Sequence, residues 1–315
     1  MEHLFSHTVY HEEENTPEGT NIGDSLKRIN ADGLELLTGF FSPSPHYKRM
    51  VGGVHLPYST DWHSVWSGTF VPDPNEDVKF IHFGHDRKEM VSNVTDAIGF
   101  ASELEPKYGV FHAGSVRLSE VLALKRTDKD EDVLRSLTEM MNAVVKNFPK
   151  GEPPFTILFE NLWWPGLTMK DDKGFRILKN DLEFDNWGLC LDTGHLMNAL
   201  GSCRDESESV KALIDIFKRY PKEMKDRIKT VHLQLSTSAD YTDNYVPPDD
   251  KVPEAERWKF LYSHISKIDQ HRPFTSPACV ELINILRPDQ VTHELPSGTW
   301  EGRLEIFRGQ RSFFQ

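Results

Sequence analysis

The segment WGLCLDTGH occupies residues 187–195 and joins an apolar run to two side chains with metal-ligand chemistry. The run ends at Asp192, and His195 follows three residues later, past a Thr-Gly pair. A short apolar run bounded in this way indicates a buried strand that turns into a helix. Asp192 and His195 can therefore face the same pocket at the carboxyl end of this strand.

Seven further apolar runs lie on either side of this segment and are rich in the β-branched and aromatic residues that strands prefer. The eight runs are LFSHTVY (4–10), GLELL (33–37), VGGVHL (51–56), YGVFH (108–112), TILFEN (156–161), WGLCLD (187–192), TVHLQL (230–235) and QVTHEL (290–295). Helices are expected between most of them, at 88–104, 130–147, 206–219 and 277–286. This alternation predicts an α/β fold, a (β/α)8 TIM barrel that forms a single domain over residues 1–315.

Two connections, residues 57–87 and 236–253, are too long for the tight loops of such a barrel. Long loops of this kind in a compact domain are usually lids or binding loops. We expect both to lie over the mouth that the carboxyl ends of the strands form.

Composition limits the partners and the location of the protein. Lys+Arg 36 against Asp+Glu 49 gives a formal net charge of −13, which disfavours nucleic acid and anionic lipid as partners. The first twenty residues lack the features of a signal peptide, and no apolar stretch is long enough for a membrane span. Three cysteines without a CxxC pattern indicate neither a disulfide framework nor a cysteine zinc site. We expect a cytoplasmic protein with a small-molecule substrate; the oligomeric state stays open.

Six of the eight runs have a histidine, aspartate or glutamate at or near the carboxyl end. These residues are His55, His112, Glu160, Asp192, His232 and Glu294. In a barrel those ends converge on one face, where active sites of this fold are built. A single histidine at a strand end is usually a half-buried residue without a ligand role. Carboxylates, however, are rarely buried unless they are paired or bind a metal, so six such residues together predict a metal centre.

Two local patterns extend this set. His195 belongs to it through DTGH, and IDQH contributes Asp269 and His271, whose side chains point the same way if the segment is extended. The preceding residues look helical, so Asp269 could simply end a helix, but Pro273 favours a loop above the barrel mouth. Nine donors exceed the roughly three protein ligands of one catalytic zinc, and they predict two or three divalent ions. Zn²⁺ suits these donors best, with Mn²⁺ or Fe²⁺ as alternatives.

Other side chains are candidates for contact with the substrate. His85 and Arg87, with His82 in the same IHFGHDR segment, could line the entrance and hold an anionic group, or could belong to an ordinary surface loop. Trp163 and Trp164 directly follow a strand end and could form a stacking wall or simply pack.

Three more residues could support the site. Glu35 lies in the second run, and we expect its carboxylate to orient a ligand histidine. His7 and His11 flank the first run and could reach the same face, although the glutamates at 12–14 favour a solvated loop. Phosphate-binding loops and serine-hydrolase or kinase patterns do not occur in the sequence.

Taken together, these segments resemble the xylose-isomerase-like TIM barrels (AP endonuclease family 2), which include sugar isomerases and epimerases and endonuclease IV-type apurinic/apyrimidinic endonucleases. The resemblance runs through DGLEL, GGVHLPY, VFHAGS, LFENLWW, CLDTGH, TVHLQ, DQH and THELP. Both branches share a quartet that is matched by Glu160, Asp192, His232 and Glu294. The endonuclease-like branch adds five ligands that are matched by His55, His112, His195, Asp269 and His271.

The resemblance also implies how these donors divide among three ions. The first ion would be held by His55, His112 and a bridging Glu160. The second would be held by Glu160, Asp192, His232 and Glu294. The third would be held by His195, Asp269 and His271.

We therefore expect a metal-dependent hydrolase of a phosphoester or phosphodiester in a small or medium-sized metabolite, with a nucleotide-like or cobamide-like substrate as one option. A metal-bridged hydroxide would attack phosphorus, with Glu160 bridging, Glu294 orienting the hydroxide and Asp192 beside them. The alternative is a sugar or sugar-phosphate isomerase or epimerase that uses one ion on the quartet. An endonuclease acting on abasic DNA and a barrel that only binds a metabolite are further alternatives.

Overall fold

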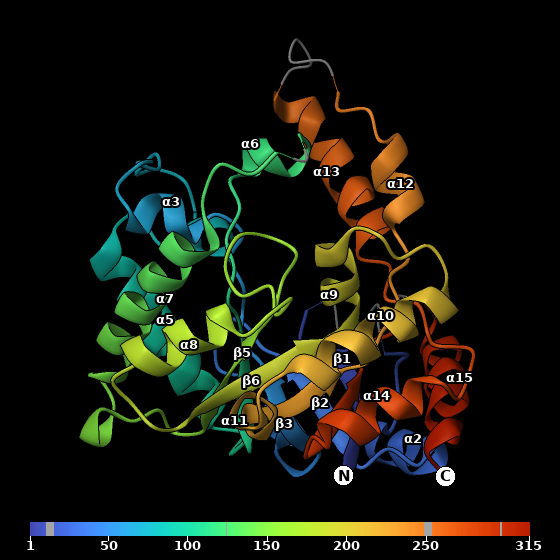
Figure 1. Ribbon diagram of the computed structural model, residues 1–315. Helices are drawn as coiled ribbons and strands as arrows, with labels where there is room; N and C mark the ends of the chain where they lie inside the picture. Colours follow the sequence, from blue (N-terminus) through green and yellow to red (C-terminus); the bar gives the residue numbers. More distant parts are fainter. Residues whose placement is uncertain (11–15, 124, 249–253, 297) are drawn as a thin grey trace.

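The eight apolar runs form one closed barrel of parallel strands in a computed structural model that describes residues 1–10, 16–123, 125–248, 254–296 and 298–315 (Figure 1). The strands are β1 (Glu2–Thr8), β2 (Gly33–Leu37), β3 (Val51–His55), β4 (Tyr108–His112), β5 (Thr156–Glu160), β6 (Trp187–Asp192), β7 (Ile228–His232) and β8 (Gln290–His293). Each strand pairs with the next, and β8 pairs with β1, so the sheet closes. The predicted single (β/α)8 barrel is confirmed.

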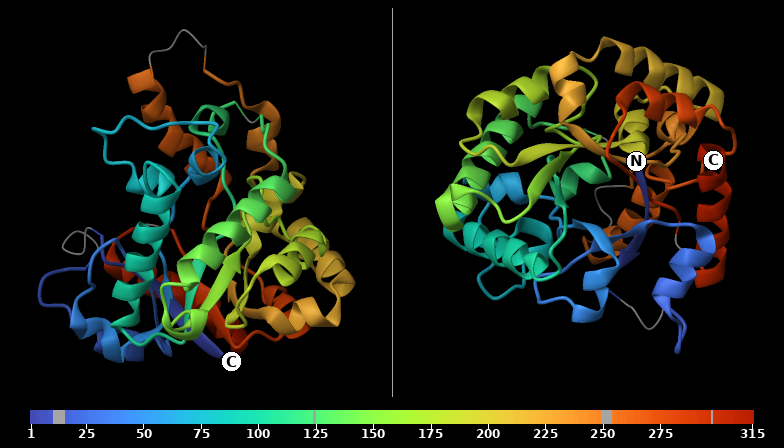
Figure 2. Two further views of the ribbon diagram at one scale, coloured as in Figure 1. Left: turned by 90° about the vertical axis from the view of Figure 1, so that its left-hand side faces the viewer. Right: turned by 90° about the horizontal axis from the view of Figure 1, so that it is seen from below.

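Helices surround the strands, as the view from below in Figure 2 shows. They are α2 (Ile22–Ile29), α3 (Trp62–Trp66), α4 (Lys79–His82), α5 (Arg87–Ser102), α6 (Leu118–Val121), α7 (Asp130–Val145), α8 (Lys173–Asp181), α9 (Thr193–Leu200), α10 (Glu206–Arg219), α11 (Lys222–Arg227), α12 (Ala239–Asn244), α13 (Glu254–Ile268), α14 (Cys279–Leu286) and α15 (Trp300–Arg311). The four predicted helical segments correspond to α5, α7, α10 and α14, with ends within two residues of the prediction. None of the helices among the described residues is long and apolar enough to cross a membrane.

Side chains of each strand alternate between the inside of the barrel and the helices outside it. On β6, Trp187, Leu189 and Leu191 belong to the large apolar core between sheet and helices, whereas Cys190 belongs to a small inner core. The other members of the inner core are Leu4, Tyr108, Val110 and Leu158. Asp192 lies two residues beyond Cys190 and therefore faces inward at the carboxyl end of the barrel.

The register of the strands brings the predicted donors to one level. His112 on β4 pairs with Glu160 on β5, and Asp192 on β6 pairs with His232 on β7. Glu294 is the first residue after β8. The carboxyl ends of the strands thus place polar side chains around one mouth, above the inner apolar core.

The ring of Tyr108 fills the inside of the barrel next to Gly53. A Cβ atom on Gly53 would lie 2.2 Å from Cζ of Tyr108, so only glycine leaves room for this ring. The Tyr108 hydroxyl then donates a hydrogen bond of 2.6 Å to Oε2 of Glu35. This contact holds a buried carboxylate directly below the level of the donors.

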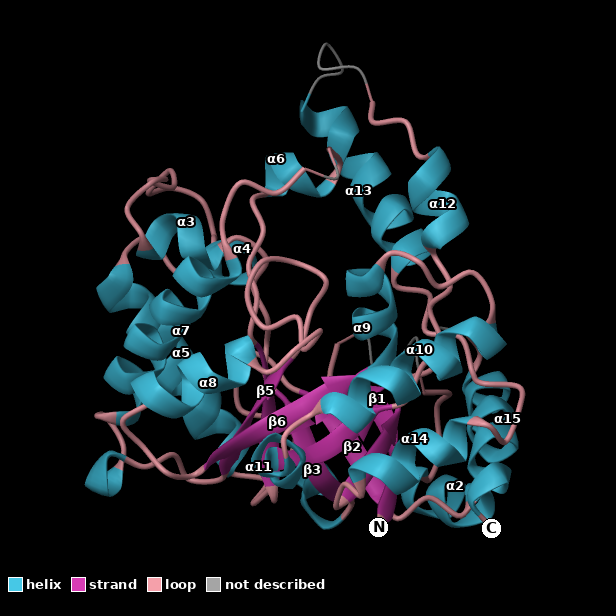
Figure 3. Cartoon of the chain, in the orientation of Figure 1, coloured by secondary structure: helices cyan, strands magenta, loops and turns pink. Residues whose placement is uncertain are grey.

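The two long connections follow β3 and β7 and leave the barrel at the mouth (Figure 3). Residues 57–87 contain α3 and α4, and the second connection contains α12; its residues 249–253 lie outside the described residues. Beyond it, α13 approaches α6 in an apolar cluster. The cluster consists of Val116, Val121, Leu162 and Trp164, with Trp163, Leu261 and Ile265 packed against it.

Candidate metal centre

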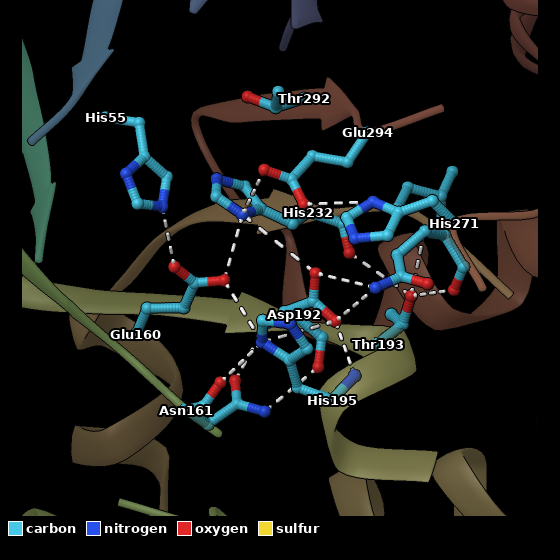
Figure 4. A network of polar contacts seen from close by, with 12 residues as sticks. His55, Glu160, Asn161, Asp192, Thr193, His195, His232, His271, Thr292 and Glu294 are labelled. Atoms are coloured by element: carbon cyan, nitrogen blue, oxygen red, sulfur yellow. Dashed lines mark hydrogen bonds and ion pairs between the residues drawn. The ribbon is translucent and has the colours of Figure 1, made fainter. Parts of the chain in front are cut away.

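Glu160 lies among imidazole rings at the barrel mouth, and Figure 4 shows its contacts with His55, His232 and His195. Its Oε2 atom lies 3.2 Å from Nε2 of His55 and 3.3 Å from Nε2 of His112. Its Oε1 atom lies 3.1 Å from Nδ1 of His232. Glu160 is completely buried at the end of β5, and its two oxygens face histidines from strands on both sides of it.

Backbone carbonyls determine which ring nitrogen faces the carboxylates. Nδ1 of His55 lies 2.8 Å from the carbonyl oxygen of Leu56, and Nδ1 of His195 lies 2.9 Å from that of Asn161. A carbonyl oxygen can only accept, so Nδ1 donates its hydrogen in both rings. Nε2 is then the nitrogen directed at the carboxylates of the mouth, and it would carry the lone pair whenever the ring is neutral.

The second ring nitrogen of His232, Nε2, faces the carboxylate of Glu35. Nε2 lies 2.8 Å from Oε1 of Glu35. Glu35 itself accepts hydrogen bonds from the hydroxyls of Tyr108 and Thr292, at 2.6 and 2.9 Å. The carboxylate of Glu35 thus forms an ion pair with a histidine of the site; that it orients a metal ligand stays a prediction.

Three carboxylates surround Nδ1 of His232. Glu160 Oε1 lies at 3.1 Å, Glu294 Oε1 at 3.3 Å and Asp192 Oδ2 at 4.0 Å. These four residues come from β5, β6, β7 and the end of β8, and they match the quartet that the resemblance implies.

The Asp-x-His segment joins the site from outside the barrel. Its helix, α13, ends one residue before Asp269, and Oδ2 of Asp269 lies 2.8 Å from Nε2 of His271 and 3.3 Å from Nε2 of His195. An antiparallel bridge between Leu235 and Arg272 ties the segment to the connection after β7. The structure thus brings Asp269 and His271 to the mouth despite the long insertion before them.

The buried carboxylates influence one another's protonation. Burial raises the pKa of Asp192 to about 7, and the neighbouring charge of Glu294 adds to this rise. Burial also disfavours the charged form of Glu160, but the imidazoles of His232, His112 and His195 together outweigh it and hold the pKa of this carboxyl well below its usual value. Every ion pair described for the carboxylates of the mouth is with a histidine. The charge of these carboxylates is balanced by imidazoles alone among the described residues.

This donor set fits divalent cations. Among the described residues, four groups have ligand atoms within 4.8 Å of one another: His55–His112–Glu160, Glu160–Asp192–His195, Glu35–His232–Glu294 and Glu160–Cys190–His232. Imidazole nitrogens and carboxylate oxygens face each other at about 3 Å. Protonated rings satisfy these contacts, whereas neutral rings would present lone pairs to the carboxylates and call for a cation between them. All nine predicted donors converge, and their role as ligands stays a prediction.

The two predicted tryptophans lie in different environments. The ring centroid of Trp163 lies 5.0 Å from that of His195, so this side chain is beside the donors. Trp164 is buried in the apolar cluster between α6 and α13. The position of Trp163 is compatible with a stacking wall, and that of Trp164 with packing.

The side chains that were candidates for binding an anionic substrate group contact other parts of the protein. Nδ1 of His85 lies 2.8 Å from Oε2 of Glu89, and Arg87 donates a hydrogen bond of 2.6 Å to the carbonyl oxygen of Trp66. The Arg87 guanidinium also lies over the ring of Trp66, 4.8 Å from its centroid. These contacts fasten the start of α5 to α3, and they give no support to a role in substrate binding. His82 is likewise held by a backbone carbonyl.

His7 and His11 do not join the described donors. His7 is buried on β1 against Tyr47 and Trp300, because the inward and outward positions of β1 alternate and His7 falls on the outer one. His11 lies outside the described residues.

Sequence reasoning missed two amides and one aromatic ring at the mouth. Gln234 and Asn161 both hydrogen-bond to Asp192, through its carboxylate and its backbone respectively. The ring of Tyr58 stacks on His112, with centroids 4.7 Å apart. The sequence could have indicated Gln234, because it is two residues beyond His232 and therefore on the same face of an extended chain.

Comparison with known proteins gives a family and a fold. The family model described as "xylose isomerase-like TIM barrel" matches residues 54–291. No protein with a curated description matches the chain.

Among solved structures, endonuclease IV from Thermus thermophilus is similar, with a TM-score of 0.56, 14% identity and coverage of 100% of this chain and 99% of the other. A D-tagatose 3-epimerase-like protein has a TM-score of 0.54 and 15% identity, with 100% and 97% coverage. The IOLI protein with a bound zinc atom has a TM-score of 0.50 and 14% identity, with 100% and 96% coverage. At these identities the likeness shows the fold alone.

Proposed function

The chain belongs to the xylose isomerase-like TIM barrel family, and from this premise we propose that it is a metal-dependent hydrolase of a phosphoester or phosphodiester in a small or medium-sized metabolite. The proposal includes two or three divalent ions, zinc first and manganese or iron as alternatives. It also includes a cytoplasmic location, in keeping with three free cysteines.

The observation that carries this proposal is the division of donors by the two oxygens of Glu160. Oε2 faces His55 and His112, whereas Oε1 faces His232 and, at 3.3 Å, Nδ1 of His195. A carboxylate with imidazole nitrogens at each oxygen is suited to span two cations. A one-metal enzyme has no use for the pair of histidines at Oε2.

Divalent ions in such a site supply a nucleophile from water near neutral pH and positive charge for the phosphoryl oxygens and the leaving group. The chain's own residues then have separate tasks. Glu160 spans two donor sets, and Asp192 completes the set at Nδ1 of His232. Glu294 is the least buried carboxylate of that set, with a side chain 13% exposed, so it is the one that can orient an attacking water.

Two arrangements support a compact substrate. Trp163 and Tyr58 place aromatic faces beside His195 and His112, next to the donors. A planar group attached to the phosphoester could stack there. The net charge of −13 opposes the approach of a long polyanion such as DNA.

The test uses protein purified without chelator and two generic probes, p-nitrophenyl phosphate for monoesters and bis(p-nitrophenyl) phosphate for diesters. We expect the wild type to hydrolyse one probe. Asp269→Ala and His271→Ala should each lower the rate at least about 100-fold, because removing a donor of the third set would remove several kcal/mol of charge stabilisation in the transition state. His63→Ala is the matched control, since His63 is buried on α3 among contacts that do not include these donors.

A sugar or sugar-phosphate isomerase or epimerase is the second candidate. The observation that favours it is the quartet around His232, since three carboxylates at one nitrogen suffice for a single ion and leave carboxylates for proton exchange. A chain that carries one ion, interconverts ketoses and aldoses, and tolerates Asp269→Ala and His271→Ala would be this isomerase, and the hydrolase proposal would be wrong.

A further inference from the structure

Gln234 lies between two carboxylates that belong to different donor sets. Its side chain is completely buried, and Nε2 lies 2.8 Å from Oδ1 of Asp269. The same Nε2 atom lies 3.2 and 3.4 Å from the two carboxylate oxygens of Asp192. One amide therefore joins the quartet inside the barrel to the Asp-x-His segment outside it.

A short relay fixes the orientation of this amide. The backbone N–H of Gln270 donates a hydrogen bond of 2.9 Å to Oγ of Ser236. Ser236 Oγ lies 2.8 Å from Oε1 of Gln234 and donates its own hydrogen there. Because Oε1 is the acceptor in this relay, the NH₂ group must face the carboxylates. The first donor of this relay, Gln270, belongs to the same segment as Asp269, which the Gln234 amide contacts.

The space for the Gln234 amide depends on a glycine of α9. A Cβ atom on Gly194 would lie 2.2 Å from Oε1 and 2.5 Å from Nε2 of Gln234. A methyl group at residue 194 would therefore displace the amide without any change to Gln234 itself. This gives a second and independent way to disturb the same contact.

We propose that Gln234 is the positioning residue that holds residues 269–271 against the barrel mouth and thereby completes the donor set of His195, Asp269 and His271. The segment follows α13 and a long connection, so the barrel strands alone do not place it. A neutral amide with two N–H groups can donate to both carboxylates at once, which lowers their mutual repulsion and keeps them apart at a fixed spacing. The role in completing the donor set rests on the proposed metal centre; the role in holding the segment does not.

The first test measures amide hydrogen exchange on chelator-treated protein, where metal makes no contribution. Gln234→Met keeps the shape of the side chain and removes both donors. We expect the amides of Gln270 and Arg272 to exchange about tenfold faster or more in this variant, since they donate to Ser236 and Leu235 only while the segment stays docked. Asn142→Leu is the control, because Asn142 is a buried amide on α7.

The second test measures metal affinity by titration of Zn²⁺ into the apo protein. Gln234→Met and Gly194→Ala should each weaken the ion of the His195, Asp269 and His271 set by about 10- to 100-fold and weaken the other ions less. Gly99→Ala is the control for the glycine variant, since a Cβ atom on Gly99 meets nothing within 4 Å. Rescue by Gln234→Asn, which restores an amide one methylene shorter, should be partial.

The outcomes separate this inference from the proposed function. Unchanged exchange at Gln270 and Arg272 in Gln234→Met would overturn the inference, as would equal exchange changes in Asn142→Leu. Loss of every ion to the same degree would also overturn it, because a general loss of structure would then explain the result. A wild type with a single ion would instead reject the proposed function, and the exchange measurement on apo protein would still decide the role of Gln234.

Discussion

At the scale of single residues, Glu160 and Glu35 offer a sharp comparison. Both are buried carboxylates that contact His232, but Glu160 faces its Nδ1 atom and Glu35 its Nε2 atom. Glu160→Gln removes the charge shared by two donor sets, so we expect it to lower the metal content by about one ion or more. Glu35→Gln leaves the donors in place and should weaken affinity about 10- to 100-fold without changing saturated stoichiometry.

Elemental analysis of both variants at saturating Zn²⁺ measures this difference. Equal metal content in Glu160→Gln and Glu35→Gln would show that Glu160 does not bridge.

Residue positions also show how far sequence reasoning reaches. The inward donors at strand ends, such as His112 and Asp192, follow from a periodicity of two and the convergence of parallel strands. The contacts of Gln234 did not follow, because its partner Asp269 comes from a segment after α13 whose path no local pattern determines. Residue type alone leaves Arg87 open between the entrance and an ordinary surface loop, and its contact with Trp66 depends on how α3 folds back on α5.

At the scale of elements, Asp192 serves two structures at once. It ends β6, and its side chain accepts a hydrogen bond of 2.6 Å from the backbone N–H of His195, which caps the first turn of α9. Asp192→Asn keeps an acceptor at this position, whereas Asp192→Ala removes it. In chelator-treated protein we therefore expect only the alanine variant to lose about 1 kcal/mol of unfolding free energy.

Urea unfolding of both variants measures this cap, and both should lose metal. If the asparagine variant is destabilised as much as the alanine variant, the capping role of Asp192 is refuted.

The elements themselves were the most predictable part of the fold. Four amphipathic helices and eight apolar runs have periods that reveal them, and the ends of α10 agree with the sequence to the residue. The run at 4–10 was placed two residues late, since β1 spans Glu2–Thr8 and pairs with β8 through the polar residue Glu2. The short helices α3, α4, α6 and α12 were not expected, because four to six residues are too few for a period to appear.

At the scale of the whole molecule, the negative net charge disfavours DNA as the substrate of the proposed metal centre. A chain of −13 repels a polyanion, and the described mouth is lined with carboxylates. We expect DNA that contains abasic sites to be cleaved far more slowly than a small phosphoester probe at low ionic strength. Efficient cleavage of such DNA would keep the metal centre but refute the use of net charge to exclude nucleic acid.

Buried histidines away from the mouth give the molecule a dependence on pH. Burial lowers the pKa of His7 to about 4, whereas the unfolded chain keeps a value of about 6.5. Above pH 6.5 the His7 ring is neutral in both the folded and the unfolded state, so its titration costs no stability. Between pH 6.5 and 4 the unfolded state binds more protons, so the free energy of unfolding falls as the pH falls toward 4. The loss amounts to at most about 3 kcal/mol for this residue.

Urea unfolding of metal-free protein at pH 7.5 and pH 4.5 measures this effect. His7→Leu should show a smaller loss of stability between the two pH values than the wild type. An identical loss in both proteins would mean that His7 does not resist protonation in the folded state.

The central claim is that the mouth holds more than one ion, divided by the two oxygens of Glu160. The most direct measurement is the number of metal ions per chain, determined by elemental analysis of protein purified without chelator and again after reconstitution of apo protein with Zn²⁺. We predict two or three ions per wild-type chain in the reconstituted protein. One ion per chain at saturation would contradict the claim.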